Sequence, residues 1–530
     1  MSDAAASDEQ ARSSWKPAHN PWLVALAVTL AAFMEILDTT IVNVSLPHIA
    51  GSLSSTYDDA TWTLTSYLVA NGIVLTISGW LAKVFGRKRY FLICIAMFTL
   101  SSFLCGIATG LGQLIIFRLM QGFFGGGLQP CQQSIILDTF PPEKRAAAFG
   151  LTAIATVVGP VLGPTLGGWI TDSFSWRWIF FINVPFGILT MLSVAFLVED
   201  PPWACKQSAP VDTLGICLIT LGFGCLEVMV DRGEDDDWFG SGFICVMAIL
   251  AVSGLTSAVL WLLSPRNRHP AVDLAVFRDR NFAVGTFLVG MMGALLYSSS
   301  IVVPQYAQQV MGYTATLAGL VLSPGGVAVI VLIPLVGRLM NLMSVRSLIA
   351  FGFGSLSIAL FWSAHLVPQL DFWHMVFYRL SQTACLAFLF VPLSTIAYST
   401  LPARLRSDGS AMFSMSRNVM GSLSISGVIA LITETRQARQ NGMVHNMVPY
   451  SQPYNDYLAQ ARQVATDHGI SVHAVDSFAM NALYTDFSRQ VTTLAYNQVF
   501  VILSMAAAMA VPLCFLLSAM KGGGKAGPAH

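Results

Sequence analysis

The sequence predicts an all-α polytopic membrane protein with fourteen transmembrane helices, arranged as two six-helix pseudo-repeats plus two inserted helices. Of the 530 residues, 55% are hydrophobic and only 11% are charged, whereas soluble domains carry about 25% charged residues. Apolar segments long enough to cross a bilayer recur along the chain, and short motifs of the first half recur in the second. The formal net charge is zero, which gives no indication of a nucleic-acid partner.

Each predicted span is an apolar run of roughly 20 residues, the length at which a helix crosses the hydrocarbon core of a bilayer. The N-terminal segment before the first run is polar and contains acidic residues, so it does not fit a cleaved signal peptide. The predicted spans cover residues 22–44, 61–82, 90–110, 112–137, 146–170, 177–198, 212–230, 240–263, 282–303, 315–336, 347–366, 372–397, 409–433 and 497–519.

Basic residues in the connecting segments predict the orientation of the spans. With the N-terminus inside, the inner segments hold 19 lysines and arginines and the outer segments hold 6. An even number of spans then returns the chain to the side on which it began. Both termini are therefore expected to be cytoplasmic.

An internal repeat relates the first and second halves of the chain. Residues 117–121 recur as residues 378–382, an offset of 261. Such repeats indicate two homologous halves, and paired halves with a site near the bilayer midplane are the architecture of many secondary transporters. The predicted organisation is a cytoplasmic tail at 1–21, a six-helix half at 22–198, a linker with two inserted helices at 199–280, a six-helix half at 281–520 that includes a periplasmic loop at 434–496, and a cytoplasmic tail at 521–530.

Two acidic residues lie inside the first predicted span. Glu35 and Asp38 are three residues apart, which places both on one face of a helix. A charged side chain in a span costs ~2.5–3.5 kcal/mol on insertion scales, so this face is expected to meet a cavity or a partner rather than lipid. The pattern favours a proton-carrying site, and the alternative is a pair of groups that hydrogen-bond neighbouring helices.

Arg118 is a basic residue inside the fourth predicted span, where it needs a partner. Arg118 and Asp38 each lie a few residues from the outer end of their spans. Since a helix rises ~1.5 Å per residue, the two side chains fall at a similar depth, which permits a direct or water-bridged pair. The alternative is that Arg118 extends to the outer membrane interface.

Glycines and basic residues mark the inner loop between the second and third spans. Gly79 and Gly86 permit a close helix approach and a sharp turn. Arg87 and Lys88 can contact helix C-termini or anionic lipid headgroups. We interpret these four residues as a gating element, with retention of the loop on the cytoplasmic side as the alternative.

The outer half of the fifth span has a repeated glycine-proline pattern. Its glycines recur at every fourth position and form one small-residue face, which permits close contact with a neighbouring helix. Its prolines remove backbone donors and bend the helix. We interpret this segment as a seal or rocking surface, and ordinary tight packing is also compatible with the pattern. The residues are Gly159, Pro160, Gly163, Pro164 and Gly167.

Four stretches together carry a family resemblance that covers nearly the whole chain. Residues 37–43, 79–88, 118–127 and 159–168 resemble, in order and spacing, motifs of the major facilitator superfamily. The resemblance is to its fourteen-span drug:proton antiporter branch, which includes the Emr-type multidrug exporters. One departure is Lys83, which stands where the inner-loop motif commonly has an acidic residue.

The resemblance implies a role for each motif residue. Asp38 is expected to be the proton-coupling carboxylate, Arg118 to assist its protonation or release, and Glu35 to bind a proton or a cationic substrate. The counterpart of Asp38 in the second half falls near residues 296–298, which contain no acid. The substrate cavity is expected to be lined by Glu35, Asp38, Asn43, Gln121, Gln129, Tyr297, Arg379 and Gln382.

The implied function is proton-coupled efflux of lipophilic drugs or toxic compounds across the bacterial inner membrane. No cofactor or metal is expected, because the proton gradient drives transport. Resemblance to the Emr-type exporters also implies a periplasmic adaptor protein and an outer-membrane channel as partners. Membrane lipids surround the chain, and no nucleic acid is expected.

Other classes of function fit the residues less well. An exporter or importer of a specific metabolite would have the same fold. A membrane-embedded enzyme would need a nucleophile–base or metal constellation, but His48, His365 and His374 are isolated and no HExxH or GxSxG pattern accompanies them. The nine cysteines show no metal-type spacing. A channel would need a filter motif, and none is recognisable.

Two further features lie outside the shared motifs. Glu227 is intramembrane but belongs to the inserted pair of helices, and we interpret it as structural. The outer segment 434–496 is long, polar and rich in tyrosine. Because tyrosine is enriched at interface cores, the segment is predicted to dock the adaptor. A self-packed lid or a surface-lying amphipathic segment is the alternative.

Overall fold

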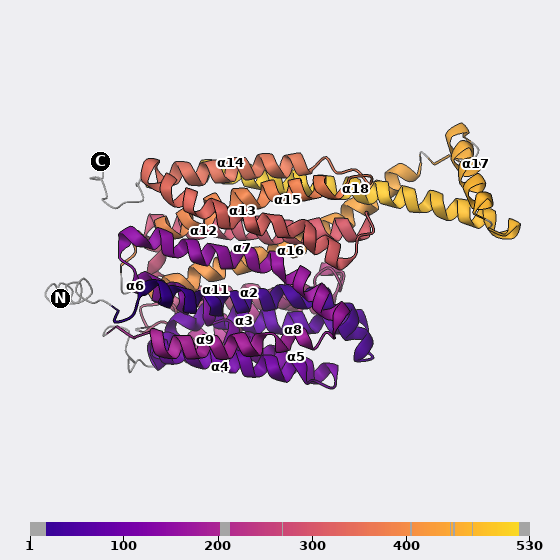
Figure 1. The fold of residues 1–530 in the computed structure, drawn as a ribbon. Helices are drawn as coiled ribbons and strands as arrows, with labels where there is room; N and C mark the ends of the chain where they lie inside the picture. The colour runs from indigo at the N-terminus through magenta and orange to yellow at the C-terminus, as the bar shows by residue number, and fades with distance from the viewer. Residues whose placement is uncertain are drawn as a thin grey trace.

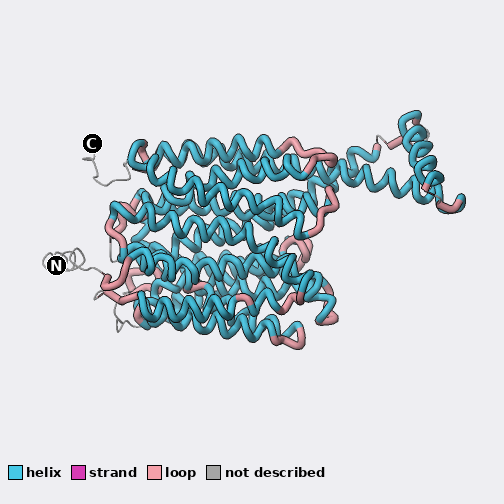
Figure 2. The backbone as a smooth tube through the Cα atoms, in the orientation of Figure 1, coloured by secondary structure: helices cyan, strands magenta, loops and turns pink. Residues whose placement is uncertain are grey.

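The structure, a computed structural model, is built almost entirely of helices that run side by side (Figures 1 and 2). It describes residues 17–201, 212–267, 269–402, 405–445, 447–448, 451–468 and 470–518, so the predicted terminal tails lie almost wholly outside the described residues. The first half contains α2 (Pro21–Ser52), α3 (Tyr57–Phe85), α4 (Arg87–Gly106), α5 (Leu111–Gly125), α6 (Leu128–Thr139), α7 (Pro142–Ser173), α8 (Trp178–Phe181) and α9 (Asn183–Leu197).

The rest of the chain continues the same pattern. The inserted pair is α10 (Thr213–Arg232) and α11 (Gly242–Leu262), with two short 3-10 helices, η2 (Trp238–Gly240) and η3 (Leu274–Arg278). The second half contains α12 (Arg280–Gln309), α13 (Ala315–Leu342), α14 (Val345–Ser363), α15 (Phe372–Ala397), α16 (Arg406–Val444), α17 (Gln452–Asp467) and α18 (Val472–Cys514).

The predicted number of fourteen spans is not confirmed. In the described residues, 12 helices are long and apolar enough to cross a membrane, or 13 when the two parts of α7, bent by 43° after Pro160, are counted as one span. The predicted span 112–137 falls on α5 and α6, which have only 15 and 12 residues. The helix breaks at Gly126 and Gly127, whose backbones pack so closely on α3 and α4 that an added Cβ would lie 2.5 Å from a neighbouring atom.

The inserted helices lie beside the boundary between the two halves. On one side of the bundle α3 packs against α16, and α10 packs against both of them. On another side α7 packs against α13. Large apolar side chains are exposed along the bundle, for example Phe196 on α9, Leu260 on α11 and Ile358 on α14. Such a surface suits the interior of a bilayer, and the chain is a multi-pass membrane protein.

The segment 434–496, which the sequence predicts as a long loop, is mostly helical. The helix α16 continues to Val444, α17 follows, and α18 begins at Val472; the three project beyond one end of the bundle (Figure 1). The change from apolar to polar residues ends a predicted span, but it does not end a helix, because glutamate, arginine and glutamine are good helix formers. The membrane helices therefore extend beyond the bilayer.

Contacts between α17 and α18 hold the projecting segment together. Leu458 is buried, and Arg462 forms an ion pair with Asp476 at 2.7 Å. The Tyr457 hydroxyl donates a hydrogen bond to Asp486. Partial burial, together with this carboxylate, raises the pKa of Tyr457 to about 12, so the phenol remains a donor at neutral pH.

Candidate functional site

A buried ion pair joins the first and fourth predicted spans. Asp38 on α2 and Arg118 on α5 are both fully buried, and Arg118 Nη1 lies 2.5 Å from Asp38 Oδ2. The predicted common depth of the two residues is thus realised as a direct contact. A buried charge without a partner is strongly unfavourable, so each residue stabilises the other in this position.

Neutral groups complete the surroundings of the Asp38 carboxylate. Its Oδ1 accepts hydrogen bonds from Gln121 Nε2 at 2.9 Å and from Asn183 Nδ2 at 2.8 Å. Arg118 also donates to the Thr63 carbonyl at 3.1 Å, and its guanidinium lies 4.1 Å from the ring centre of Tyr67. The carboxylate therefore accepts three side-chain hydrogen bonds. These bonds link α2 to α5 and α9.

Glu35 lies one turn before Asp38 and faces the second half. Its Oε1 accepts a hydrogen bond from Asn71 at 3.0 Å, while its Oε2 is buried without a hydrogen-bond partner. Gln129 and Arg417 lie close to it, and Arg417 donates a hydrogen bond to Gln129. Because Arg417 belongs to α16, two opposite charges from the two halves face each other here, and no ion pair joins them in the described residues.

The glycine face of α7 packs against the same turns of α2. A Cβ added at Gly159 would lie 2.6 Å from Ile36, and one at Gly163 would lie 2.0 Å from the Thr40 hydroxyl. The face thus holds its own half together at the level of the buried acids. On another face of α7, Thr165 meets Ser323 of α13 at 3.5 Å, so that face reaches the second half.

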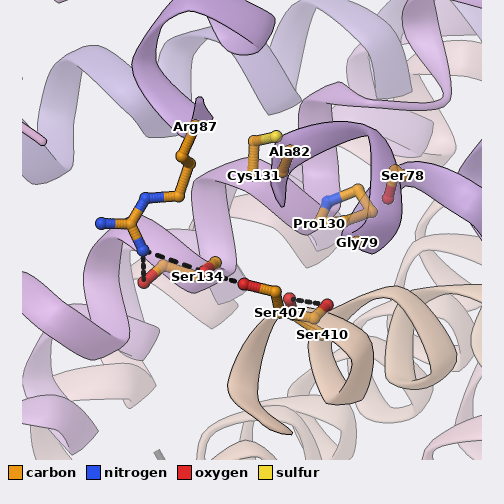
Figure 3. A pocket seen from close by; sticks show the side chains of 9 residues that line it. All are labelled: Ser78, Gly79, Ala82, Arg87, Pro130, Cys131, Ser134, Ser407 and Ser410. Atoms are coloured by element: carbon orange, nitrogen blue, oxygen red, sulfur yellow. Dashed lines mark hydrogen bonds between the residues drawn. The ribbon is translucent and has the colours of Figure 1, made fainter. Parts of the chain in front are cut away.

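The two halves are tied together at the end of the bundle where α2 begins. Lys83 on α3 forms an ion pair with Asp408 on α16 at 2.6 Å. A Cβ at Gly79 would lie 2.9 Å from Asp408 Oδ1, so glycine is needed for this approach. The neighbouring small pocket, which also includes Ser134 and Ser407, lies between the halves (Figure 3). Lys83, which departs from the family motif, thus bridges the halves as a cation.

The remaining residues of the inner-loop motif anchor the same region. Gly86 has a φ of 84°, a left-handed conformation that other residues rarely adopt. Arg87 forms an ion pair with Asp138 at 2.6 Å, and Arg406 of the second half contacts the same carboxylate at 3.1 Å. The backbone N–H of Lys88 donates to Asp200 at 2.9 Å, and burial raises the pKa of Asp200.

The structure places the other predicted cavity residues in three different surroundings. Gln121 and Gln129 belong to the buried networks of Asp38 and Glu35, and Tyr297 lies beside Arg417. Asn43 is exposed on α2. Two further predicted residues are buried inside the second half, in the surroundings of Ser299: these are Arg379 and Gln382.

Pseudo-symmetry identifies the second-half counterpart of Asp38, which the sequence places near residues 296–298. Ser299, rather than a residue in 296–298, stands 261 residues after Asp38 and contacts Arg379, as Asp38 contacts Arg118. Glu227 lies on α10 near Asp231 and Ser422, apart from both of the buried networks described above. Within the described part of the chain, no group of three His, Cys, Asp or Glu residues could hold a metal ion.

Three residues of the site escaped prediction from the sequence. Asn71 and Asn183 are single amides in apolar spans, and Arg417 is an intramembrane arginine outside any recognised motif. The only signal available was that polar residues inside spans are uncommon and need partners. That signal fits Arg417 but does not identify the partner.

Comparison with known proteins decides the family. Residues 28–425 match the model of the Major Facilitator Superfamily. The chain belongs to this superfamily. The human organic anion transporter MFSD10 has a similar fold, with a TM-score of 0.57, 11% sequence identity, and coverage of 92% of this chain and 100% of that one.

Closer relatives place this superfamily member among the Emr-type exporters, as the motifs predicted. It is 38% identical to the multidrug export protein EmrB of Haemophilus influenzae, over 83% of this chain and 86% of that protein. It is 36% identical to EmrB of Escherichia coli, over 82% and 83%. The fatty acid resistance protein FarB of Neisseria gonorrhoeae is 34% identical, over 93% and 95%. Membership indicates a transporter rather than an enzyme.

Proposed function

We propose that this protein is a proton-coupled antiporter that exports lipophilic drugs or toxic compounds across the bacterial inner membrane. The observation that carries the proposal is the fully buried Asp38–Arg118 ion pair, one turn from Glu35 at the boundary between the halves. The names of the EmrB relatives support the substrate class. The proton gradient drives the cycle without a cofactor.

In this mechanism a proton and Arg118 compete for Asp38. Protonation removes the charge that holds the guanidinium, so proton binding loosens the contact between α2 and α5. Glu35 and Arg417 lie where the halves face each other, and a substrate bound there contacts both halves. Movement of one half against the other around such a site is the general mode of alternating access.

Orientation follows from the basic loops. If the end with Lys83 and Arg406 faces the cytoplasm, the ion pairs to Asp408 and Asp138 close the transporter on that side. Both termini are then cytoplasmic, and α17 projects into the periplasm. The apolar outer surface of the bundle contacts membrane lipids.

The function is tested with the purified protein in proteoliposomes that hold a pH-sensitive dye. Adding a lipophilic drug such as ethidium, or an uncoupler-like weak acid, is expected to drive proton movement through the protein. Protein-free vesicles measure the passive leak. If neither class of compound moves protons above that leak, while a counterflow assay detects exchange of a small metabolite, the protein is a transporter of that metabolite instead.

We further propose that the projecting helices dock a periplasmic adaptor, so that substrate passes on to an outer-membrane channel. Tyr484 on α18 and Val448 are exposed on this segment, far along the chain from the proton site. Exposed apolar side chains on a projecting segment suit a protein partner. The tyrosines in this segment are also typical of interface residues.

Replacing residues 440–490 with a short Gly/Ser linker is expected to spare drug–proton exchange in proteoliposomes and to remove drug resistance from cells with two membranes. The design is feasible because Arg439 on α16 contacts Gln498 on α18 at 3.2 Å, so the two helices are adjacent at the cut. The two assays are compared on the same variant, with membrane expression measured by immunoblot.

A matched point variant separates docking from folding of the projection. Arg462→Gln breaks only the ion pair between α17 and α18, and it should keep resistance. Loss of exchange by the linker variant in proteoliposomes would show that the segment serves the transport cycle itself, and the docking proposal would be wrong.

A further inference from the structure

Arg379 on α15 is a fully buried cation that none of the mechanism above uses. Its Nη1 donates to Ser299 Oγ at 2.9 Å and its Nη2 donates to Ser300 Oγ at 2.7 Å. Gln382 Oε1 lies 3.4 Å from Nη1, and Nε is buried without a hydrogen-bond partner. No ion pair joins Arg379 to a carboxylate in the described residues, and the acceptors that surround it are neutral.

The corresponding site in the first half is neutralised. Arg118 and Gln121 precede Arg379 and Gln382 by the same 261 residues, and Asp38 precedes Ser299 by that same offset. The two halves therefore keep the arginine and the glutamine but differ in the group opposite them. A carboxylate is present in the first half and a hydroxyl in the second.

Because of this difference, no side-chain carboxylate balances the positive charge of Arg379 in the described residues. The guanidinium remains protonated under all physiological conditions. A buried charge with only neutral acceptors is far less stable than one with a counter-ion. Serine carries a hydroxyl on Cβ where aspartate carries a carboxylate, so the exchange removes the negative charge and leaves a smaller side chain.

We propose that Arg379, Ser299 and Ser300 bind a small monovalent inorganic anion, chloride under cellular conditions, in place of the missing carboxylate. The Arg379 Nε–H is an available donor. Both serine hydroxyls now donate to the Leu296 carbonyl, and each can rotate to donate to an anion instead. The site is enclosed in the second half, since Arg379 and Gln382 are both 0% exposed. Enclosure favours a compact ion over a bulky organic acid.

The test measures thermal unfolding of the purified full-length protein in detergent, with chloride replaced by gluconate at constant pH and ionic strength. A ligand that binds only the folded state raises the Tm, here by about 2–4 °C at saturation. Bromide and nitrate should act like chloride. An equal Tm in chloride and gluconate would overturn the proposal.

Substitutions at the proposed site test whether it causes the chloride dependence of the Tm. Ser299→Asp recreates the charge arrangement of the first half and is expected to make the Tm independent of chloride. Ser299→Asn fills the same space without supplying a charge, so it should also weaken the chloride dependence but should be less stable than Ser299→Asp. Arg379→Gln removes the cation and should also abolish the dependence. Dependence that persists in both Ser299→Asp and Arg379→Gln would place the anion elsewhere and refute this site.

Binding to the wild-type protein decides the matter if these variants do not fold. Radiolabelled chloride should bind in scintillation proximity assays with about one ion per chain, and bromide but not gluconate should displace it. Absence of displaceable binding would refute the site. None of these measurements involves drug or proton transport, so the result is independent of the proposed antiport.

Discussion

The Asp38→Asn variant is expected to lose drug-driven proton movement in proteoliposomes completely, while its level in the membrane is retained. Asparagine keeps the shape of the side chain and can still accept hydrogen bonds from Gln121 and Asn183. It cannot carry a proton, and it leaves the buried Arg118 without a counter-charge. Breaking a buried pair in this way costs about 3–5 kcal/mol, so some loss of thermal stability should accompany the loss of coupling.

Two companion variants separate coupling from stability. Asp38→Glu keeps the acid at a shifted position and is expected to keep part of the activity. Glu227→Gln removes an intramembrane acid that lies outside the Asp38 and Glu35 networks and should transport normally. Undiminished proton movement by Asp38→Asn would exclude Asp38 as the proton carrier, and Glu35 would become the leading candidate.

Gly163→Leu is expected to block transport and to lower the thermal stability of the protein. The first side-chain carbon alone would lie 2.0 Å from the Thr40 hydroxyl, 2.7 Å from Thr40 Cβ and 3.2 Å from the Ile41 backbone nitrogen. Rotation of Thr40 cannot relieve the contacts to Cβ and backbone, so α7 and α2 must separate. Overpacking typically costs about 1–3 kcal/mol, and here the displaced helix carries Asp38.

The measurement pairs a transport assay with a thermal unfolding curve. Gly354→Leu is the matched control, because a Cβ at this position of α14 meets nothing within 4 Å; it should leave both readouts near the wild-type values. Normal efflux by Gly163→Leu would remove the glycine face from the mechanism. Leakage of protons without drug would instead support its predicted role as a seal.

The Asp38–Arg118 contact was predictable because the fixed rise per residue of a helix relates position in the sequence to depth in the membrane. Two spans that run in opposite directions, each with one charge near its outer end, place the charges at the same level. Position along a span does not give the rotation of the helix about its own axis, and this rotation decides which side chains meet. Asn183 and Asn71 were therefore missed, although both lie within hydrogen-bond distance of the buried acids.

Contacts between the halves were still harder to predict. Lys83 and Asp408 are separated by 325 residues and are joined only by the packing of α3 against α16. The glycine face of α7 was recognised, but the sequence did not name its neighbour, which is α2. The outer segment 434–496 was predicted as a loop because hydropathy marks the membrane boundary and not the end of a helix.

The helices α16 and α18 continue without a break beyond the bundle and form a projecting arm on the second half (Figure 1). At ~1.5 Å per residue, the 43 residues of α18 span roughly 65 Å, about twice the ~30 Å hydrocarbon thickness of a bilayer. Since α17 packs against the far part of this helix, any tilt of the second half during transport is transmitted outside the membrane. A tilt of ~5° would displace the tip of an arm ~30 Å long by roughly 3 Å. A protein bound at the tip would then be displaced by this distance in each transport cycle.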